Sequence, residues 1–371
     1  MTRPGALLGR FEGEAARLAL ARCEGIGPRQ FRRLLDRHRT AEAALAALAS
    51  KAPERLPDPG AIAAECEAMA ELGARFLFLG EAGYPPLLAE LSDPPPVLAV
   101  LGDPAALAPR AVAIVGARNA SALGQRFAER LAADLARAGL AVVSGLARGI
   151  DAAAHSGALA GRGRTIAAIA GGLDVAYPAE NAALQERIVA EGGLLVTEAP
   201  LGTRPQARHF PRRNRLIAGL ALGVVVVEAM DKSGTLITAR LALDQGRELF
   251  AVPGHPFEPR ARGPNELLRQ GAHICEGVED VLAHLPEAPA DTPLLAPAPP
   301  PRRRPAPPAP PATPTLPEAA ALLDLLGPTP VSVDDLARCC QLSPDLLRPL
   351  LLELELEGRV HTLPGDRVVR A

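Results

Sequence analysis

A cluster of arginines followed by a hydroxyl-rich turn is the part of this sequence whose residue types most directly imply chemistry. The cluster spans twelve residues and contains Arg204, Arg208, Arg212, Arg213 and Arg215. No acidic residue occurs from Ala199 to Val227. Cationic side chains that lack acidic neighbours repel one another unless an anion joins them. The cluster therefore predicts a binding site for a phosphate-bearing ligand.

The turn after the cluster adds backbone donors to these charges. Gly223–Val227 is a short apolar run typical of a buried parallel strand, and Lys232-Ser233-Gly234-Thr235 is predicted to open the next helix. The first N–H groups of a helix have no intrahelical partner and carry a partial positive charge, which favours anions. Side-chain and backbone donors are thus expected at one rim of a sheet.

Similar glycine-rich segments follow other predicted strands. Glycine lets a backbone approach a ligand closely, and most of these segments lead into a helix. Arg118 and Arg148 would add full charges at the same rim as Lys232. The segments are Gly116-Ala117-Arg118-Asn119, Ser144-Gly145-Leu146-Ala147-Arg148-Gly149, Ala170-Gly171-Gly172-Leu173-Asp174 and Glu228–Thr235.

Apolar runs that alternate with amphipathic helices must hold these loops in place. In the predicted helix Gln125–Ala138, Phe127, Leu131 and Leu135 share one face. Alternation of this kind predicts an α/β fold with a doubly wound parallel sheet, whose ligand crevice lies beyond the carboxyl ends of the strands. The predicted strands are Ala111–Val115, Leu140–Val143, Thr165–Ala170, Leu194–Thr197, Gly223–Val227 and Glu248–Val252.

Composition divides the 371 residues into four predicted parts. Residues 1–75 are rich in alanine and leucine with helical periodicity, and residues 76–288 carry the strand–helix alternation. Residues 289–315 are proline-rich, which predicts an extended tether. In the first part, Cys23–Pro28 resembles a helix-hairpin-helix turn whose amides hold a phosphate, and an ordinary tight turn between helices is the alternative.

Residues 316–371 are predicted to form a winged helix, with three helices and a hairpin. This tail holds nine acidic residues against five arginines, and Pro349 is expected to bend its third helix. A role in protein interaction or regulation is therefore at least as well supported as DNA binding. The expected elements are helices Leu316–Leu326, Val333–Cys340 and Ser343–Glu357 and strands Arg359–Leu363 and Arg367–Arg370.

Bulk composition narrows the class of protein. The net charge is −2, so any affinity for nucleic acid must come from local segregation of charge. Five cysteines without CxxC spacing predict reduced thiols and no zinc site. The longest apolar run, Leu216–Val227, is too short to span a bilayer, and the N-terminus lacks a signal-peptide stretch. We expect a cytoplasmic protein without cofactor or metal and without membrane contact.

Catalysis finds weaker support in the sequence. Ser144, Asp151 and His155 are the residue types of a hydrolase triad, but no GxSxG elbow is present. Asp151 is expected instead to cap its helix, and His155 to pack or form a hydrogen bond locally. GxGxxG and Walker A motifs are also absent. Glu198 and Glu228, at strand ends, are expected to balance Arg212 or Arg215, with Glu228 as an acid for glycosidic cleavage as the minority alternative.

Several motifs together resemble the DNA-processing protein DprA (Smf) family. The resemblance runs almost continuously over about residues 80–280, and the flanking regions are similar to the longer, three-domain members. The motifs are AVAIVGARNAS, VVSGLARGIDAAAH, AGGLDVAYPAEN, FPRRNRLIAGL, VVVVEAMDKSGTLITARLALDQGRELFAVPG and LLRQGA.

The resemblance implies a non-enzymatic protein that binds and protects incoming single-stranded DNA and loads the RecA recombinase in natural transformation. It also implies an extended Rossmann-like domain that forms a homodimer, with an N-terminal SAM- or helix-hairpin-helix-like domain and a winged-helix tail. The implied strand-binding residues are Gly116, Arg118, Gly145, Arg148, Gly149, Arg212, Arg213, Arg215, Lys232, Ser233, Gly234 and Thr235. We expect charge reversal at Arg212 and Arg215 to abolish strand binding with little change in thermal stability.

Two alternatives remain open. One is a Rossmann-fold hydrolase of nucleotide N-glycosidic bonds, of the lysine-decarboxylase-like group. That group carries a PGGxGTxxE turn, whereas this chain has DKSGTLITA without the PGG or the glutamate. The other is a structural scaffold whose tail recruits partners, which would leave the rim arginines unexplained.

Overall fold

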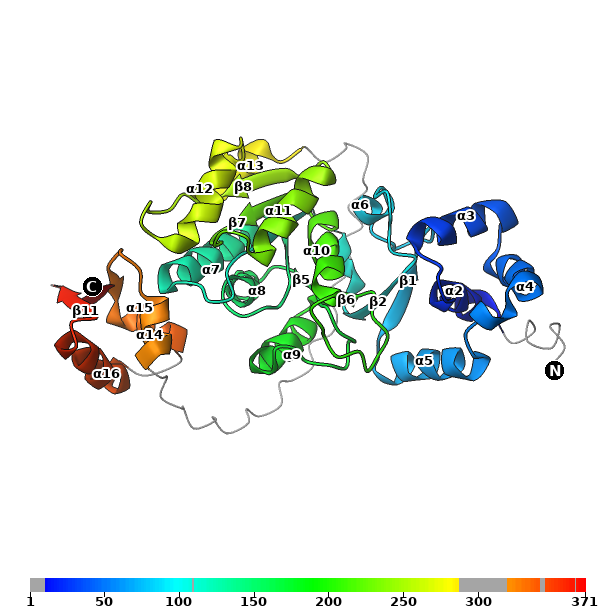
Figure 1. The fold of residues 1–371 in the computed structure, drawn as a ribbon, viewed down its shortest axis with the longest axis horizontal. Coiled ribbons are helices and arrows are strands. Elements are labelled where there is room, and N and C mark those ends of the chain that lie inside the picture. Colours follow the sequence, from blue (N-terminus) through cyan, green and yellow to red (C-terminus); the bar gives the residue numbers. More distant parts are fainter. Residues whose placement is uncertain (1–10, 109, 287–318, 341–343, 364) are drawn as a thin grey trace.

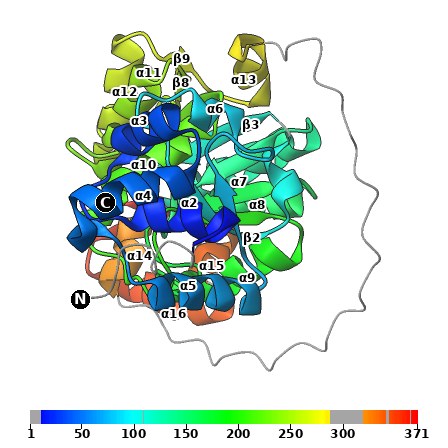
Figure 2. The same cartoon turned by 90° about the vertical axis from the view of Figure 1, so that its right-hand side faces the viewer.

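The computed structural model describes residues 11–108, 110–286, 319–340, 344–363 and 365–371. A helical domain, a central sheet domain and a small C-terminal domain follow one another along the chain (Figure 1). The proline-rich tether predicted at 289–315 lies outside the described residues. The N-terminal and C-terminal domains lie at opposite ends of the central domain (Figure 1), and the N-terminal helices face the viewer in Figure 2.

The N-terminal domain is a bundle of α-helices that packs on one edge of the sheet. The turn predicted at Cys23–Pro28 joins the first two helices, and Gly25 adopts a φ of 70°, which suits glycine. Phe31 lies at the centre of the bundle and shares a buried cluster with Phe78 and Val97 of the sheet domain. The α-helices are α2 (Gly13–Arg22), α3 (Pro28–His38), α4 (Ala41–Lys51) and α5 (Pro59–Glu71).

The central sheet has nine strands in the order β1-β2-β6-β5-β4-β3-β7-β8-β9. All six predicted strands are present, with ends that differ by no more than two residues. The strands are β1 (Arg75–Phe78), β2 (Val97–Gly102), β3 (Ala111–Val115), β4 (Ala141–Ser144), β5 (Thr165–Ala168), β6 (Leu194–Thr197), β7 (Gly223–Val226), β8 (Glu248–Ala251) and β9 (His273–Ile274).

The predicted doubly wound parallel sheet is confirmed from β6 to β9, and two antiparallel strands extend it at one edge. The strands from β6 to β9 are parallel, but β2 pairs antiparallel with β6, and β1 pairs antiparallel with β2. Residues 79–96, which include the one-turn helix α6 (Pro86–Ala89), connect β1 to β2. The result is a mixed, mostly parallel sheet whose β1–β2 edge contacts the N-terminal helices.

Helices cover both faces of the sheet. Alternate residues of β3 point to opposite sides: Ala113 packs in the cluster with α10 and α11, and Ile114 packs in the cluster with α7, α8 and α13. No described helix is long and apolar enough to cross a membrane. The helices of this domain are α6 (Pro86–Ala89), α7 (Ala122–Arg137), α8 (Ile150–Ala160), α9 (Ala182–Ala190), α10 (His209–Gly219), α11 (Gly234–Asp244), α12 (Arg262–Arg269) and α13 (Val278–His284).

Helices α7 and α8 are in unusually close contact because small residues line their interface. A Cβ atom on Gly157 would lie 2.0 Å from the carbonyl oxygen of Glu129. A Cβ on Gly163, just after α8, would lie 2.4 Å from the Cβ of Ala136. Real Cβ atoms are not found at such distances, so these glycines set how closely the two helices pack.

The C-terminal domain has the predicted winged-helix order of elements, with one additional short strand. Its third helix continues through Pro349, where one backbone N–H donor is missing. All five cysteines of the chain are free thiols, as predicted. The elements are α14 (Ala319–Leu325), β10 (Val331–Ser332), α15 (Val333–Cys340), α16 (Pro344–Leu356), β11 (Val360–Leu363) and β12 (Arg367–Arg370), and β12 lies between β10 and β11.

Candidate functional site

The loops after β3, β4 and β7 meet at the carboxyl edge of the sheet, as the parallel fold requires. The Thr235 hydroxyl donates to the carbonyl oxygen of Gly116 at 3.0 Å, which links the start of α11 to the loop after β3. The backbone N–H of Ile150 donates to the carbonyl oxygen of Ala117 at 3.3 Å, which links the start of α8 to the same loop. The loop that carries Arg118 is therefore held from both sides.

A cavity of about 350 Å³ opens at this edge and is the candidate site, called here the basic pocket. It brings together four of the residues implied by the sequence: Arg118, Gly145, Arg148 and Arg213. Its two aromatic residues and its acidic residue were not predicted from the sequence, and these are Tyr177, Phe210 and Glu180.

Arg213 is the buried cation of the basic pocket, with 6% of the residue exposed. Its Nη1 atom lies 3.6 Å from a carboxylate oxygen of Asp151, and neither its Nη1 nor its Nε has a hydrogen-bond acceptor among the described residues. Burial raises the pKa of Asp151, whereas the charge of Arg213 opposes that rise. A buried guanidinium with unfilled donors favours the arrival of an anion.

Two arginines flank the ring of Phe210. The guanidinium carbon of Arg118 lies 4.7 Å from the ring centroid and that of Arg213 lies 5.7 Å from it. The rings of Phe210 and Tyr177 are 6.0 Å apart, and Tyr177 is 45% exposed. Cation–π contacts hold guanidinium groups in place without neutralising them. The pocket therefore offers positive charge and exposed aromatic surface together.

Arg148 lies at the mouth of the basic pocket. Its Nη1 is 3.7 Å from a carboxylate oxygen of Glu180, and both side chains are mostly exposed. An exposed ion pair at this distance contributes little to stability, because water screens it. Arg148 can therefore exchange Glu180 for another anion at small cost.

The other predicted site residues lie outside the basic pocket. Arg212 is exposed on α10 and makes no ion pair among the described residues. Lys232 is exposed before α11, where its φ is 60°. Gly116, Gly149, Ser233, Gly234 and Thr235 lie in the loops and helix starts beside the pocket.

Arg215 was predicted to bind the strand, but it pairs with acidic side chains of the protein itself. Its guanidinium is 11% exposed and pairs with Glu198 at 2.6 Å and with Asp93 at 3.3 Å. The balancing role predicted for Glu198 is confirmed. This internal pairing removes the basis for expecting unchanged stability after charge reversal at Arg215.

The possible hydrolase residues are all engaged elsewhere. The Ser144 hydroxyl donates to the carbonyl oxygen of Ile114 at 2.6 Å. His155 is fully buried, its Nδ1 lies 2.7 Å from the Thr165 hydroxyl, and burial lowers the pKa of His155 to about 3. Asp151 does not cap its helix, because its carboxylate accepts from the backbone N–H of Gly145. No triad is assembled.

Glu228 does not balance the arginine cluster, and the expectation that it pairs with Arg212 or Arg215 is wrong. Its carboxylate accepts hydrogen bonds from the backbone N–H and the hydroxyl of Ser121, at 2.9 and 2.5 Å. A Cβ on Gly124 would lie 2.5 Å from its carboxyl carbon. Glu228 therefore fills the N-terminal end of α7, and burial raises its pKa. The described residues contain no cluster of three or more potential metal ligands.

Gly145 is required by the position of Arg213, which gives a direct test of the pocket. A Cβ at residue 145 would lie 1.1 Å from Nη1 of Arg213, so Gly145→Ala must displace the guanidinium. We expect a loss of about 1–3 kcal/mol in the free energy of unfolding from overpacking, and about tenfold weaker binding of an anionic ligand. Denaturant unfolding and titration with oligo-dT measure the two effects.

The matched control for Gly145→Ala is a double-mutant cycle with Arg213→Ala. If the added methyl group acts through Arg213, the double variant binds no more weakly than Arg213→Ala alone. Effects on binding that simply add would show that residue 145 acts by another route.

Comparison with known proteins identifies the three domains. Residues 75–286 match the sequence profile of the family described as DNA recombination-mediator protein A. Residues 12–74 match the DprA-like N-terminal HHH domain, and residues 305–366 match the DprA winged helix domain. The helical domain and the winged helix predicted from the sequence are confirmed.

Individual relatives agree with this result. The chain is 43% identical to the DNA processing protein DprA of Bacillus subtilis over 218 residues, which cover 58% of this chain and 73% of the relative. The structure of DNA processing protein A from Streptococcus pneumoniae aligns with a TM-score of 0.64 and 32% identity, over 75% of this chain and all of the other. DNA processing protein A from Helicobacter pylori, whose structure concerns its single-stranded DNA binding mode, aligns with a TM-score of 0.51 and 32% identity over 56% of this chain and 94% of that one.

Proposed function

Because the chain belongs to the DNA recombination-mediator protein A (DprA/Smf) family, we propose that it binds single-stranded DNA in the basic pocket. We further propose that it protects incoming strands and loads the RecA recombinase on them during natural transformation or homologous recombination. The observation that carries the proposal is the grouping of Arg118, Arg148 and Arg213 around the ring of Phe210.

Electrostatic attraction to the phosphate backbone is the proposed basis of affinity. Arg118 and Arg148 are exposed and contact phosphates, while Arg213 adds charge from the floor of the basic pocket. Tyr177 and Phe210 offer ring surfaces on which a base can stack, a contact worth about 1–3 kcal/mol per base. Such binding is independent of sequence and falls steeply with salt.

The remaining loop residues have supporting roles in this proposal. Arg212 and Lys232, both exposed, extend the positive surface along the strand. Gly116, Gly149, Ser233, Gly234 and Thr235 shape the loops and offer backbone donors beside the pocket. Arg215, in contrast, has a structural role through its pairs with Asp93 and Glu198.

We propose that the protein is a cytoplasmic binding protein and not an enzyme. The internal hydrogen bonds of Ser144, His155 and Glu228 support this, since each candidate catalytic group already has a structural partner. A hydrolase of nucleotide N-glycosidic bonds finds no corresponding support.

A homodimer through the Rossmann-like domain is also proposed. Large apolar side chains are exposed on α11 and in the loop before it, and exposed apolar surface often marks a protein interface. Two pockets on one strand would gain affinity through effective concentration. Light scattering of the Ile237→Arg variant tests the dimer, with a halved mass expected. The exposed side chains are Met230, Ile237 and Leu243.

Fluorescence anisotropy of labelled oligo-dT and of a matching duplex, measured across salt concentrations, tests the function. We expect preferential binding of the single strand and a negative slope of log K against log salt, of about 0.7 per phosphate contacted. Faster assembly of RecA on strands coated with single-strand-binding protein would test the loading step. Failure to bind oligo-dT at low salt would falsify the proposal.

A further inference from the structure

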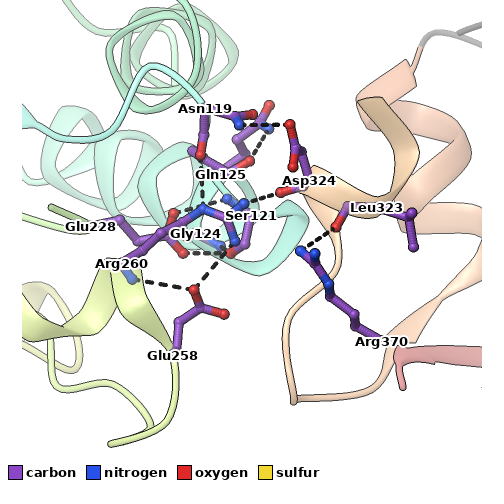
Figure 3. A network of polar contacts seen from close by, with 11 residues as sticks. Asn119, Ser121, Gly124, Gln125, Glu228, Glu258, Arg260, Leu323, Asp324 and Arg370 are labelled. Atoms are coloured by element: carbon purple, nitrogen blue, oxygen red, sulfur yellow. Dashed lines mark hydrogen bonds and ion pairs between the residues drawn. The ribbon is translucent and has the colours of Figure 1, made fainter. Parts of the chain in front are cut away.

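The winged helix is docked on the central domain through the loop that carries Arg118. The Asn119 side-chain amide donates to a carboxylate oxygen of Asp324 in α14 at 3.1 Å. The guanidinium of Arg260 donates to the carbonyl oxygen of Asn119 at 2.9 Å and also to the carbonyl oxygen of Asp324. Figure 3 shows Asn119, Asp324 and Arg260 converging from three separate segments of the chain.

A second set of contacts lies along α7. Arg126 pairs with Asp335 of α15 at 2.5 Å, and the Asp335 side chain is only 10% exposed while that of Arg126 is 60% exposed. Ala122, at the start of α7, is buried in the same apolar cluster as Leu322 and Leu336 of the winged helix. The docked position is therefore held by both ionic and apolar contacts.

The docked domain and the basic pocket share one loop. Arg118 and Asn119 are adjacent. Central-domain contacts hold the loop near Gly116 and Ala117, and Arg260 of the same domain holds it at Asn119 while also binding α14. Because Arg260 is nearly buried, its hydrogen bonds are costly to leave unmade. Removing the winged helix must therefore alter the restraints on the segment beside Arg118.

The negative charge of the winged helix indicates that its docking weakens strand binding. Residues 319–371 contain eight acidic residues against five arginines. Negative charge placed beside the Arg118 loop weakens the attraction of this region for phosphate. A strand and the docked winged helix therefore oppose each other electrostatically.

We propose that docking of the winged helix through Asn119, Arg126 and Arg260 restrains strand binding at the basic pocket, so that release of the domain strengthens it. The proposal rests on the proposed function of that pocket. Coupling between two sites is reciprocal, so binding of a strand must favour release to the same degree. Any partner that binds the released winged helix would then promote strand binding.

Charge reversal at Arg126 tests the proposal, and Arg130 supplies a matched control. Both side chains are exposed on α7, but Arg130 pairs only with Asp134 of its own helix among the described residues. Arg126→Glu places two carboxylates together at Asp335 and releases the winged helix. We expect Arg126→Glu to bind oligo-dT about fivefold more tightly than wild type at low salt, the lower range of typical coupling. Arg130→Glu, with the same loss of charge, should bind no more tightly than wild type.

The radius of gyration of the full chain, from small-angle X-ray scattering, reports release directly. It should rise in Arg126→Glu and in wild type saturated with oligo-dT, but not in Arg130→Glu. Equal affinities of the two variants would overturn the proposal, as would a radius of gyration unchanged by both Arg126→Glu and oligo-dT. Absence of oligo-dT binding by wild type would instead refute the function of the pocket.

Discussion

Replacing both Arg118 and Arg148 by glutamate is expected to abolish measurable binding of single-stranded DNA while leaving the unfolding temperature nearly unchanged. Both side chains are exposed, and Arg148 makes only a 3.7 Å ion pair with Glu180. Surface substitutions of this kind usually change the free energy of unfolding by less than about 0.5 kcal/mol. For binding, in contrast, two cations that meet phosphates are replaced by two repulsive charges at the mouth of the pocket.

Anisotropy with oligo-dT at several salt concentrations measures this effect. The single variants Arg118→Glu and Arg148→Glu should retain some binding. The slope of log K against log salt should be smaller in magnitude by about 0.7 for each phosphate that the protein no longer neutralises. The control is Arg137→Glu with Arg269→Glu, which makes the same change in net charge at exposed residues that, within the described part of the chain, pair only inside their own helices. An equally large drop in affinity in the control would mean that overall charge, and not the pocket, governs binding.

Replacing Arg215 by alanine is expected to lower the free energy of unfolding by about 3 kcal/mol, near the lower end for a broken buried ion pair. The guanidinium is 11% exposed, and Glu198 would lose its 2.6 Å partner in a mostly buried place. The Glu198 side chain keeps 23% exposure, which limits the cost. Denaturant unfolding, with the midpoint and slope fitted together, measures the change.

The pH dependence of Arg215→Ala carries a definite sign. Burial raises the pKa of Glu198, and Arg215 is the largest opposing influence, so the pKa rises further when Arg215 is removed. A carboxyl whose folded pKa lies above its unfolded pKa stabilises the fold at low pH and loses that contribution as the pH rises through the folded pKa. The loss in free energy of unfolding caused by Arg215→Ala should therefore become smaller on acidification from pH 8 to pH 5. The double variant with Glu198→Gln should recover part of the stability at pH 8, and a deficit that grows on acidification would contradict this account.

Helix geometry explains why the arginine cluster could be predicted while the role of each arginine could not. Spacing in the sequence placed Arg212, Arg213 and Arg215 together, and all three do lie on α10. Successive residues of a helix are rotated by about 100°, so Arg213 lines the pocket, Arg212 is exposed and Arg215 meets Asp93 and Glu198. The sequence does not specify how the helix is rotated against the sheet.

The sheet was predictable where each strand is a continuous apolar run between helices. The antiparallel β1–β2 pair was missed because its members lie beside the domain boundary, with no predicted helix between them. The aromatic pair of the pocket was missed for a different reason. Tyr177 and Phe210 come from separate segments, and only the folded chain brings their rings to 6.0 Å. Two of the ten phenylalanine and tyrosine residues of the sequence thus lie at the site.

The close packing of α7 against α8 has a mechanical consequence for strand recognition. The loops bearing Arg118 and Arg148 lead into the first turns of these two helices, and glycines at their interface leave no room for one helix to slide over the other. We expect the pair to move as one stiff block, so the distance between the helix ends that carry these two loops stays constant when a strand binds. A flexible strand must then adjust its own phosphate spacing to the protein, and the protein itself loses little conformational entropy on binding.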